Sequence, residues 1–365
     1  MPHSISIGLD VHARSVSACA MVHATGEVFE RGFGYDPAAI AAWAEGLPAE
    51  GPAECLYESG PTGFHLKRAL DALGLPCHVG AVAKMVRPSG DRVKTDRRDA
   101  RFLATLLAVG AFAECVPPSP ALEAARDLSR LREDVRQDLM RARHQLGKLL
   151  LRKGLAWPAG KSTWTQEHRR WLRSVRLPDP CERLVYEECL ERVRECEARR
   201  DRLDAEIARR AAGPDLAGVV SRLSALRGVS TLTAFGLAVE VGDFSRFDSP
   251  RRLMSWLGLT PSESSSGESV SRGRITKAGN SHARRLLVEA ARHQGRPLPR
   301  APEPRDDAAR ALPAAVAGMA ARANRRLHDR AVALRERGKG GNVVAVAVAR
   351  ELAGFCWALA LAGGE

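Results

Sequence analysis

Features that define several protein classes are missing from this chain of 365 residues. Its eight cysteines form no CxxC pair and no Cys/His cluster at zinc-site spacing, so a zinc finger is not expected. No run of about 18 apolar residues occurs, and the opening MPHSISIGLDVH lacks the charged and apolar regions of a signal peptide. We therefore expect a cytoplasmic protein with reduced cysteines and no membrane partner.

Acidic charge is scarce relative to basic charge. The chain carries 56 Lys and Arg against 43 Asp and Glu, which gives a net charge of +13 and a pI near 9.9. Such a balance favours an acidic polymer as partner, with nucleic acid as the first candidate. A generally Arg-rich and Ala-rich composition is the alternative, and composition leaves both interpretations open.

Residues 1–118 alternate short apolar runs with helical stretches. ISIGLDVH precedes two further strand-like runs, which are separated by the hairpin signal ATGE. Further strands are expected at AECLYES and PCHVGAV, and helices at 37–47, 63–73 and 99–111, the last after a Thr95-Asp96 start signal. Strands interleaved with helices predict an α/β domain with a mixed sheet.

Residues 119–213 have the apolar spacing of a coiled coil, roughly 3.5 residues per step. The first seam consists of Leu128, Leu131, Val135, Leu139, Ala142, Leu146 and Leu149. The second consists of Cys189, Val193, Cys196, Leu203 and Ile207, and Arg200 interrupts it. The basic segment KSTWTQEHRRWLRSVRLPDP between them predicts a connector joining two antiparallel arms.

Two mostly helical regions are expected after the arms, at 214–300 and 301–365. LSALRGVSTLTAFGLAVEV places a Gly-Val turn between helical stretches, as in a helix-hairpin-helix that offers backbone amides to phosphate. A plain αα-hairpin fits equally well. After a Pro-rich and Arg-rich linker, the apolar run AVAVARELAGFCWALAL predicts a packed C-terminal helix.

Four carboxylates stand where they could share one site. Asp10 and Glu58 each follow a buried-looking strand, where an uncompensated carboxylate is costly. Asp96 and Asp99 lie three residues apart at a helix start and therefore on one face. Such oxygen ligands suit Mg²⁺ or Mn²⁺, which can support phosphodiester chemistry. The alternative is that Asp96 caps the helix and Asp99 complements its dipole.

Two groups of cationic side chains could hold a polyanion. Around the last two carboxylates, these are Arg92, Lys94, Arg97 and Arg98, which we expect to bind the nucleic-acid backbone. The alternative for them is solvated ion pairs. A serine-rich loop within residues 257–293 is followed by RGRITKAGN, whose Arg272, Arg274 and Lys277 are further backbone-binding candidates. A serine in such a loop could act as a phosphoryl-transfer nucleophile, or the loop could be merely polar and flexible.

Taken together, the motifs IGLDVH, YESGPTG, VKTDRRDA and GLTPSESSSG with RGRITKAGN resemble those of a family of bacterial proteins. These are the insertion-sequence transposases related to the Piv and MooV DNA invertases, which carry an Asp-Glu-Asp-Asp set on an N-terminal RuvC-like domain. The resemblance covers nearly the whole chain, including the tail VARELAGFCWAL. It implies an α/β plus α architecture, with an RNase H-like (RuvC-like) domain, coiled-coil arms and a mostly helical transposase domain.

The resemblance also implies site residues and partners. Asp10, Glu58, Asp96 and Asp99 would be the catalytic set that binds Mg²⁺, with Mn²⁺ as a substitute. Ser266, which directly precedes the glycine of the Ser-Gly motif, would be the nucleophile, although the adjacent Ser264 and Ser265 remain candidates. The implied partners are the DNA of the element ends and of the target, a structured guide RNA encoded by the element, and further copies of the chain in a dimer or tetramer.

The first functional hypothesis is therefore a DNA transposase or recombinase that forms a covalent phosphoserine. A RuvC-like nuclease that activates water is the nearest alternative. An actin-like or sugar-kinase-like ATPase is another, because IGLDVHARSVSACAMV followed by GEV resembles a phosphate-binding hairpin, although its turn lacks the usual Gly, Thr or Ser. A non-catalytic nucleic-acid scaffold is the fourth.

Overall fold

The computed structural model describes residues 4–48, 51–81, 95–266, 269–297 and 311–362, with the side chains of residues 264–272 outside the described part. The chain divides into two compact units, Met1–Pro118 and Ser119–Glu365. Each unit has a hydrophobic core of its own.

A mixed sheet of five strands forms the centre of the first unit, as the alternating pattern predicts. Its strands are β1 (Ile5–Val11), β2 (Ser15–Val22), β3 (Val28–Gly34), β4 (Ala53–Glu58) and β5 (Cys77–Gly80). They are arranged in the order β3-β2-β1-β4-β5. The first three pair antiparallel, whereas β4 runs parallel to β1 and β5 runs parallel to β4.

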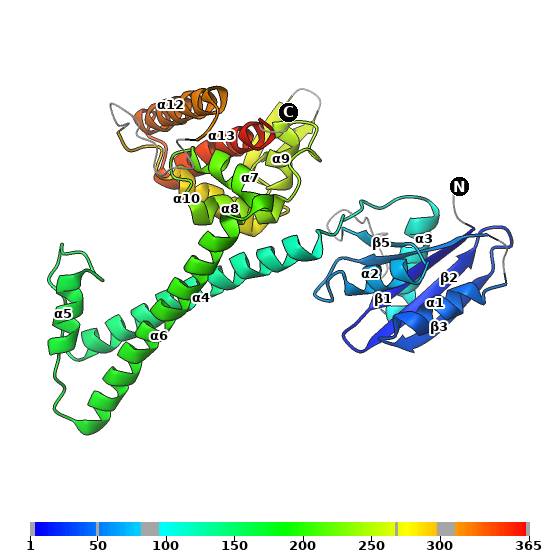
Figure 1. Cartoon of the computed structure of the whole chain (residues 1–365), viewed down its shortest axis with the longest axis horizontal. Helices are drawn as coiled ribbons and strands as arrows, with labels where there is room; N and C mark the ends of the chain where they lie inside the picture. Colours follow the sequence, from blue (N-terminus) through cyan, green and yellow to red (C-terminus); the bar gives the residue numbers. More distant parts are fainter. Residues whose placement is uncertain (1–3, 49–50, 82–94, 267–268, 298–310, 363–365) are drawn as a thin grey trace. The chain divides into compact units, whose positions relative to one another are not determined.

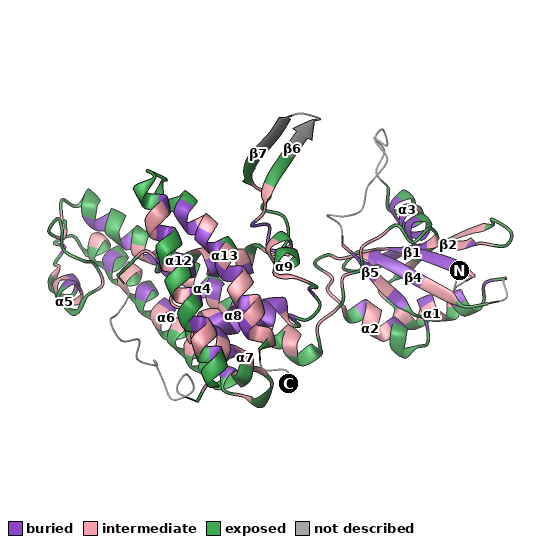
Figure 2. Cartoon of the chain, turned by 90° about the horizontal axis from the view of Figure 1, so that it is seen from above, coloured by how far each residue is buried: buried purple, intermediate pink, exposed green. Residues whose placement is uncertain are grey.

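Helices cover both faces of this sheet. α1 (Pro37–Glu45) and α2 (His65–Ala72) lie on one face and α3 (Asp96–Ala108) on the other (Figures 1 and 2). Ile7, Leu9 and Tyr57 have no exposed surface and pack in the core on the α1 and α2 side. On the opposite face, Leu56 packs against leucines of α3.

Gly8 explains how closely α3 approaches the sheet. A Cβ atom at this position would stand 1.9 Å from the carbonyl oxygen of Ala100 and 2.3 Å from the amide nitrogen of Ala104. Only glycine leaves room for such a backbone approach. Asp10 is two residues further along β1 and therefore points toward the same face, where α3 begins.

The second unit begins with the two arms. α4 (Pro120–Arg152) and α6 (Pro180–Ala211) lie side by side over much of their length (Figure 1). Val135, Leu139 and Leu146 of the first predicted seam are buried, as are Val193 and Cys196 of the second. The two arms are thus long helices that pack against each other, and a short helix, α5 (Gln166–Ser174), lies in the connector.

The seam prediction is wrong at Leu131, whose side chain is 47% exposed. Ser129 and Glu133 are buried there instead. This part of α4 packs against α8 (Thr231–Val241) as well as α6, so a different face of the helix is covered. A constant heptad spacing does not anticipate a helix that changes partners along its length.

Glu197 of α6 joins the arm to the connector. Its carboxylate accepts hydrogen bonds from Arg143 of α4 at 2.6 Å and from Arg169 of α5 at 2.7 Å. Burial alone would raise the pKa of Glu197, but the hydrogen bonds and charges of these two guanidinium groups lower it to about 2. The ion pair therefore survives well into the acid range.

We expect Glu197 to make the stability of the arm sensitive to acid. Because its folded pKa lies below the ordinary value of 4.5, its contribution is present above pH 4.5 and is lost as the pH falls from there to about 2. Thermal melts followed by circular dichroism between pH 7 and pH 2.5 should show a smaller loss in Glu197→Gln than in the wild type. The exposed Glu195→Gln is the matched control, and an unchanged pH dependence in Glu197→Gln would contradict the assignment.

The remaining helices pack around one large core. They are α7 (Pro214–Ser224), α8, α9 (Pro250–Trp256), α10 (Ser281–Ala291), α12 (Ala314–Glu336) and α13 (Gly341–Leu361). α13 is long and apolar enough to cross a bilayer, with a mean hydropathy of 1.7. Its Val348, Leu352 and Leu359 are nevertheless fully buried in this core, as predicted for a packed C-terminal helix.

The predicted Gly-Val turn joins α7 to α8, and Gly228 adopts a φ of +81° there.

The serine-rich segment is expected to be a loop but forms the antiparallel strands β6 (Pro261–Ser266) and β7 (Ser269–Ile275). This two-stranded ribbon projects from the helical unit (Figure 2). Val270 and Ile275 supply β-branched residues, whose preference for strands outweighs the polar, turn-like composition.

Candidate metal centre and serine hairpin

Two of the predicted carboxylates end neighbouring parallel strands. The register of β1 and β4 ends with the pair Leu9 and Tyr57, and Asp10 and Glu58 are the residues that follow. Parallel strands in this register present equivalent positions at the same edge of the sheet. Asp10 and Glu58 therefore stand at adjacent strand ends, on the face that α3 covers.

The other two carboxylates belong to the first turn of α3. Thr95 caps this helix, since its hydroxyl accepts a hydrogen bond from the amide of Arg98. The capping role considered for Asp96 thus belongs to its neighbour, which leaves the Asp96 side chain available for other contacts. Asp96 is exposed, whereas Asp99 is only 9% exposed.

His12 brings the two pairs together and was missed by the sequence prediction. Its Nε2 lies 3.3 Å from Oδ2 of Asp10 and 3.6 Å from Oδ2 of Asp96. His12 directly follows β1 and stands two residues after Asp10, but the sequence does not show how closely α3 approaches this strand end. The sequence pattern indicates this residue only as part of a turn that does not suit a phosphate-binding hairpin.

The electrostatics of the site favour a bound cation. Burial raises the pKa of Asp10, His12 lowers it, and the negative charges of Asp96 and Asp99 raise it further. The net shift is upward, so the ionised form of Asp10 is disfavoured by its surroundings. A divalent cation among these carboxylates would offset both the desolvation and the mutual repulsion.

The donor geometry fits one metal ion. One ligand atom each of Asp10, His12 and Asp96 lies within 4.8 Å of the others. Donors that bind Mg²⁺ at about 2.0–2.1 Å stand roughly 3–4 Å apart, so modest rotations of these side chains would complete the first contacts. Asp99 acts on Asp10 through its charge, and Glu58 stands at the adjacent strand end.

The predicted cationic rim is only partly within the described residues. Arg97 and Arg98 are exposed on the first turn of α3, next to the carboxylates. Arg92 and Lys94 lie outside the described part of the chain. The positions of Arg97 and Arg98 are compatible with contacts to a phosphate backbone that approaches the candidate metal centre.

The serine hairpin holds the predicted nucleophile at its end. In the backbone register Ser266 pairs with Ser269, the last pair before the turn, and Ser265 pairs with Val270. The side chains of Ser264, Ser265, Ser266 and Arg272 lie outside the described part. Arg274 and Lys277 are exposed nearer the base of the hairpin.

The base of the hairpin is fixed by close backbone packing. Gly279 has a φ of +68°, and a Cβ atom there would stand 1.9 Å from the carbonyl oxygen of Trp256. Arg284 donates hydrogen bonds of 2.8 Å to the carbonyl groups of Leu257 and Ala278. The motif AGNSHAR therefore anchors the ribbon to α9 and α10.

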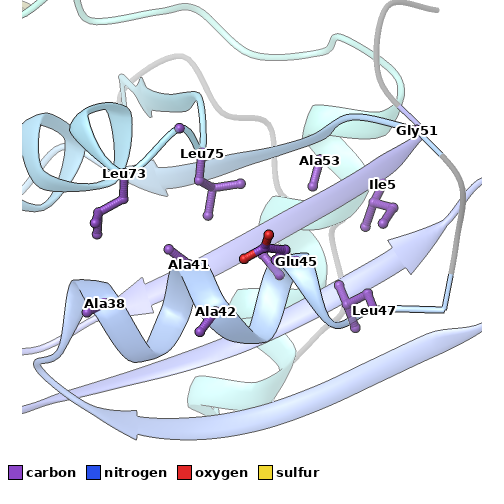
Figure 3. A pocket seen from close by; sticks show the side chains of 12 residues that line it. Ile5, Ala38, Ala41, Ala42, Glu45, Leu47, Gly51, Ala53, Leu73 and Leu75 are labelled. Atoms are coloured by element: carbon purple, nitrogen blue, oxygen red, sulfur yellow. The ribbon is translucent and has the colours of Figure 1, made fainter.

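A separate pocket of about 510 Å³ lies away from the carboxylates. Figure 3 shows apolar side chains of α1 and of the strand beginnings around it, with Glu45 as the one charged side chain labelled. Ile5 and Ala53 begin β1 and β4, whereas Asp10 and Glu58 stand at the opposite ends of these strands. The pocket is thus not part of the candidate metal centre.

Two protein-family models match the chain. Residues 7–153 match a transposase model of the DEDD type for IS110 elements, and residues 220–303 match the transposase model of the IS116/IS110/IS902 family. The first range includes all four predicted carboxylates, and the second includes the serine hairpin. Family membership of this type implies a DNA transposition enzyme that uses a divalent metal.

Named relatives agree with these models. The chain is 42% identical over 304 residues to "Putative transposase y4qE" of Sinorhizobium fredii, covering 83% of this chain and 74% of that protein. It is 31% identical over 255 residues to the transposase for insertion sequence element IS1533 of Leptospira borgpetersenii, covering 69% and 73% of the two chains. With an N-terminal and a C-terminal region matched in order, the chain belongs to the IS116/IS110/IS902 family of insertion-sequence transposases.

Proposed function

We propose that this transposase cuts and rejoins DNA with Ser266 as nucleophile and with Asp10, Glu58, Asp96 and Asp99 around Mg²⁺. The observation that carries the metal half is the approach of Asp10, His12 and Asp96 ligand atoms to within 4.8 Å of one another. The serine half is supported by the position of Ser266 at the end of a firmly anchored ribbon. Family membership favours DNA recombination over the ATPase alternative.

The proposed reaction exchanges one phosphate ester bond for another at each step and hydrolyses none. The Ser266 hydroxyl attacks a DNA phosphorus atom, a serine–phosphate bond forms, and the bond to one DNA oxygen breaks. The released DNA hydroxyl takes a proton, and the serine hydroxyl loses one. A hydroxyl end of the other DNA molecule then attacks the phosphoserine, so strands are exchanged without an external energy source.

Bound Mg²⁺ would supply charge stabilisation for the developing oxyanions in this reaction. The four carboxylates would hold it, and Arg97, Arg98, Arg274 and Lys277 would position the DNA backbone. Arg92, Lys94 and Arg272 belong to the same proposed set. The proposal requires that the ribbon and the acidic set meet on the bound DNA.

The proposal includes an RNase H-like fold for the first unit, and the strand order is its support. Its strand order places an antiparallel meander beside two parallel strands, with acidic residues at the ends of β1 and β4. A structured guide RNA and a dimer or tetramer belong to the same hypothesis. Their support is the net charge of +13, which suits sequence-tolerant backbone contacts, and the two long arms.

A covalent adduct provides the direct test. Purified protein is incubated with Mg²⁺ and a nicked DNA carrying the element end, and the adduct is digested and mapped by mass spectrometry. We expect a phosphodiester on Ser266, and no adduct from Ser266→Ala. Ser264→Ala and Ser265→Ala are the matched controls and should keep it, because each leaves the proposed nucleophile in place.

The alternative nuclease gives a different result in the same assay. If water is the nucleophile, Ser266→Ala releases a free cleaved strand at the wild-type rate and no variant forms an adduct. An adduct mapped to Ser265 would keep the mechanism and move the nucleophile by one residue. The yield of cleaved strand and the mapped position of the adduct thus distinguish these outcomes.

A further inference from the structure

A groove at the far end of the arms is not used by the proposed reaction. It has a volume of about 420 Å³ and lies along α4, with one wall formed by the loop before α5. Met140, Arg143, Gly147 and Leu151 contribute from α4 at spacings of three or four residues, and Lys148 adjoins Gly147. They therefore form one stripe, about 16 Å long at 1.5 Å per residue.

The groove combines exposed apolar surface with unpaired positive charge. Met140 is 40% exposed and Leu151 is 68% exposed. Lys148 is exposed and has no charged or hydrogen-bonding partner among the described residues. The connector at 153–179 contains six Lys and Arg against two carboxylates, and two of its cations, Lys153 and Arg169, pair with Glu182 and Glu197 of α6, which leaves an excess of two positive charges. The charge of this end of the arm is thus complementary to a polyanion.

Trp164 forms the wall of the groove in an unusual backbone conformation. Its φ is 65°, one of two positive values at non-glycine residues in the described part of the chain. The Arg143 guanidinium lies over the Trp164 ring at 4.4 Å from the ring centroid. The backbone amide of Trp164 donates a hydrogen bond of 3.1 Å to Nδ1 of His168. Arg143 is itself held by Glu197. A bulky residue kept in the left-handed region by several contacts suggests a functional constraint.

Gly147 leaves the floor of the groove open. It sits inside a helix of 33 residues, where glycine is a poor helix former. A Cβ atom at this position would meet nothing within 4 Å, so no packing inside the chain requires glycine. One use of such a glycine is to let a ligand come close to the helix backbone.

We propose that this groove binds unpaired bases of single-stranded DNA. The apolar stripe and the Trp164 ring would stack bases, and Lys148 would contact a phosphate, which is how proteins combine aromatic platforms with positive grooves. DNA is chosen because the chain belongs to a transposase family; the inference rests on the proposed function to the extent that strand exchange exposes unpaired DNA.

A second copy of the chain fits this groove less well. A two-fold contact would place the same surface against itself, so that Lys148 and the basic connector would face their own copies. Like charges brought together in this way are unfavourable.

The other aromatic residues near the groove have a separate, structural role, since Trp157, His168 and Trp171 pack on one another with ring centroids 5.0–5.5 Å apart.

The test measures the binding of a labelled 20-nucleotide oligo-dT and of a duplex of equal length by fluorescence anisotropy. EDTA is present, so strand cleavage does not contribute. Gly147→Glu should weaken oligo-dT binding at least tenfold and change duplex binding less than twofold. The new side chain fills the groove and carries the same negative charge as the DNA phosphates. This variant should fold normally, since its new side chain points into open space. Trp164→Leu should weaken oligo-dT binding in the same way.

Ala205→Glu is the matched control, because it adds the same charge to an exposed position of α6. Its neighbour Asp204 pairs with Arg132, about four turns of α4 away from Gly147. Unchanged oligo-dT binding in Gly147→Glu, or an equal loss for duplex, would overturn the proposal. Loss of oligo-rU binding alone would assign the groove to RNA and also overturn it. Because the adduct assay does not involve this measurement, each hypothesis can fail without the other.

Discussion

Asp10→Asn is expected to slow DNA strand cleavage by about 10³-fold or more. The variant keeps the size of the side chain but removes one negative charge from the candidate metal centre. Metal-assisted stabilisation of transition-state charge contributes several kcal/mol, and each 1.4 kcal/mol corresponds to about a tenfold change in rate. The measurement is a single-turnover assay with labelled DNA and saturating Mg²⁺, together with Mn²⁺ binding followed by electron paramagnetic resonance.

A loss of folding would not explain this result. Burial and the charges of Asp96 and Asp99 raise the pKa of Asp10, with His12 opposing them, so its ionised form destabilises the folded unit. Removing that charge should leave the melting temperature unchanged or raise it. Glu45→Gln is the control, since Glu45 is an exposed carboxylate of α1 on the opposite face of the sheet. Wild-type cleavage by Asp10→Asn would refute the metal role.

Much of the candidate metal centre could be predicted from strand and helix signals alone. The apolar runs before Asp10 and Glu58 predict positions at strand ends, and a capping signal predicts Asp96 and Asp99 at a helix start. The sequence could not place His12, since its proximity to Asp96 depends on how closely α3 approaches β1. That distance is set by Gly8, whose importance is visible only once the helix lies on the sheet.

Contacts between distant segments explain what the sequence did not predict. Leu131 has the spacing of a seam residue but is exposed, because α4 turns another face toward α8. The serine-rich segment forms a ribbon because its two halves pair with each other, a gain that local composition does not report. Buried charge is the third case, since the apolar sequence around Glu240 predicts its burial but not the Arg130 side chain that pairs with it.

Glu240 lies at the junction of α4, α8 and the base of the serine hairpin. Its side chain has no exposed surface. Arg130 donates two hydrogen bonds to it, at 2.7 and 2.9 Å, and Asn280 donates a third at 2.6 Å. Asn280 also caps α10. Burial alone would raise the pKa of Glu240, but these hydrogen bonds and the charge of Arg130 hold it below its usual range.

Arg130→Met is expected to destabilise the second unit strongly. It leaves a fully buried carboxylate without its main partner, a change that typically costs about 3–5 kcal/mol. Arg126 remains 3.9 Å from Glu240 and offers partial compensation, so we expect about 3 kcal/mol. For a unit of this size the melting temperature should fall by about 6–12 °C. Thermal melts followed by circular dichroism provide the measurement, with Arg194→Met, which breaks an exposed pair with Glu191, as the control.

The pH dependence distinguishes a buried charge from simple loss of packing. In the wild type the pKa of Glu240 is lowered, so its contribution to stability is present at neutral pH and is lost as the pH falls below the ordinary carboxyl range. In Arg130→Met burial dominates and the pKa rises, which means that the folded state binds a proton more tightly than the unfolded state. The difference in melting temperature between the two proteins should therefore shrink as the pH falls from 7 to 5. A constant difference over this range would mean that Arg130 acts through packing, because only an unpaired Glu240 carboxylate is relieved by protonation.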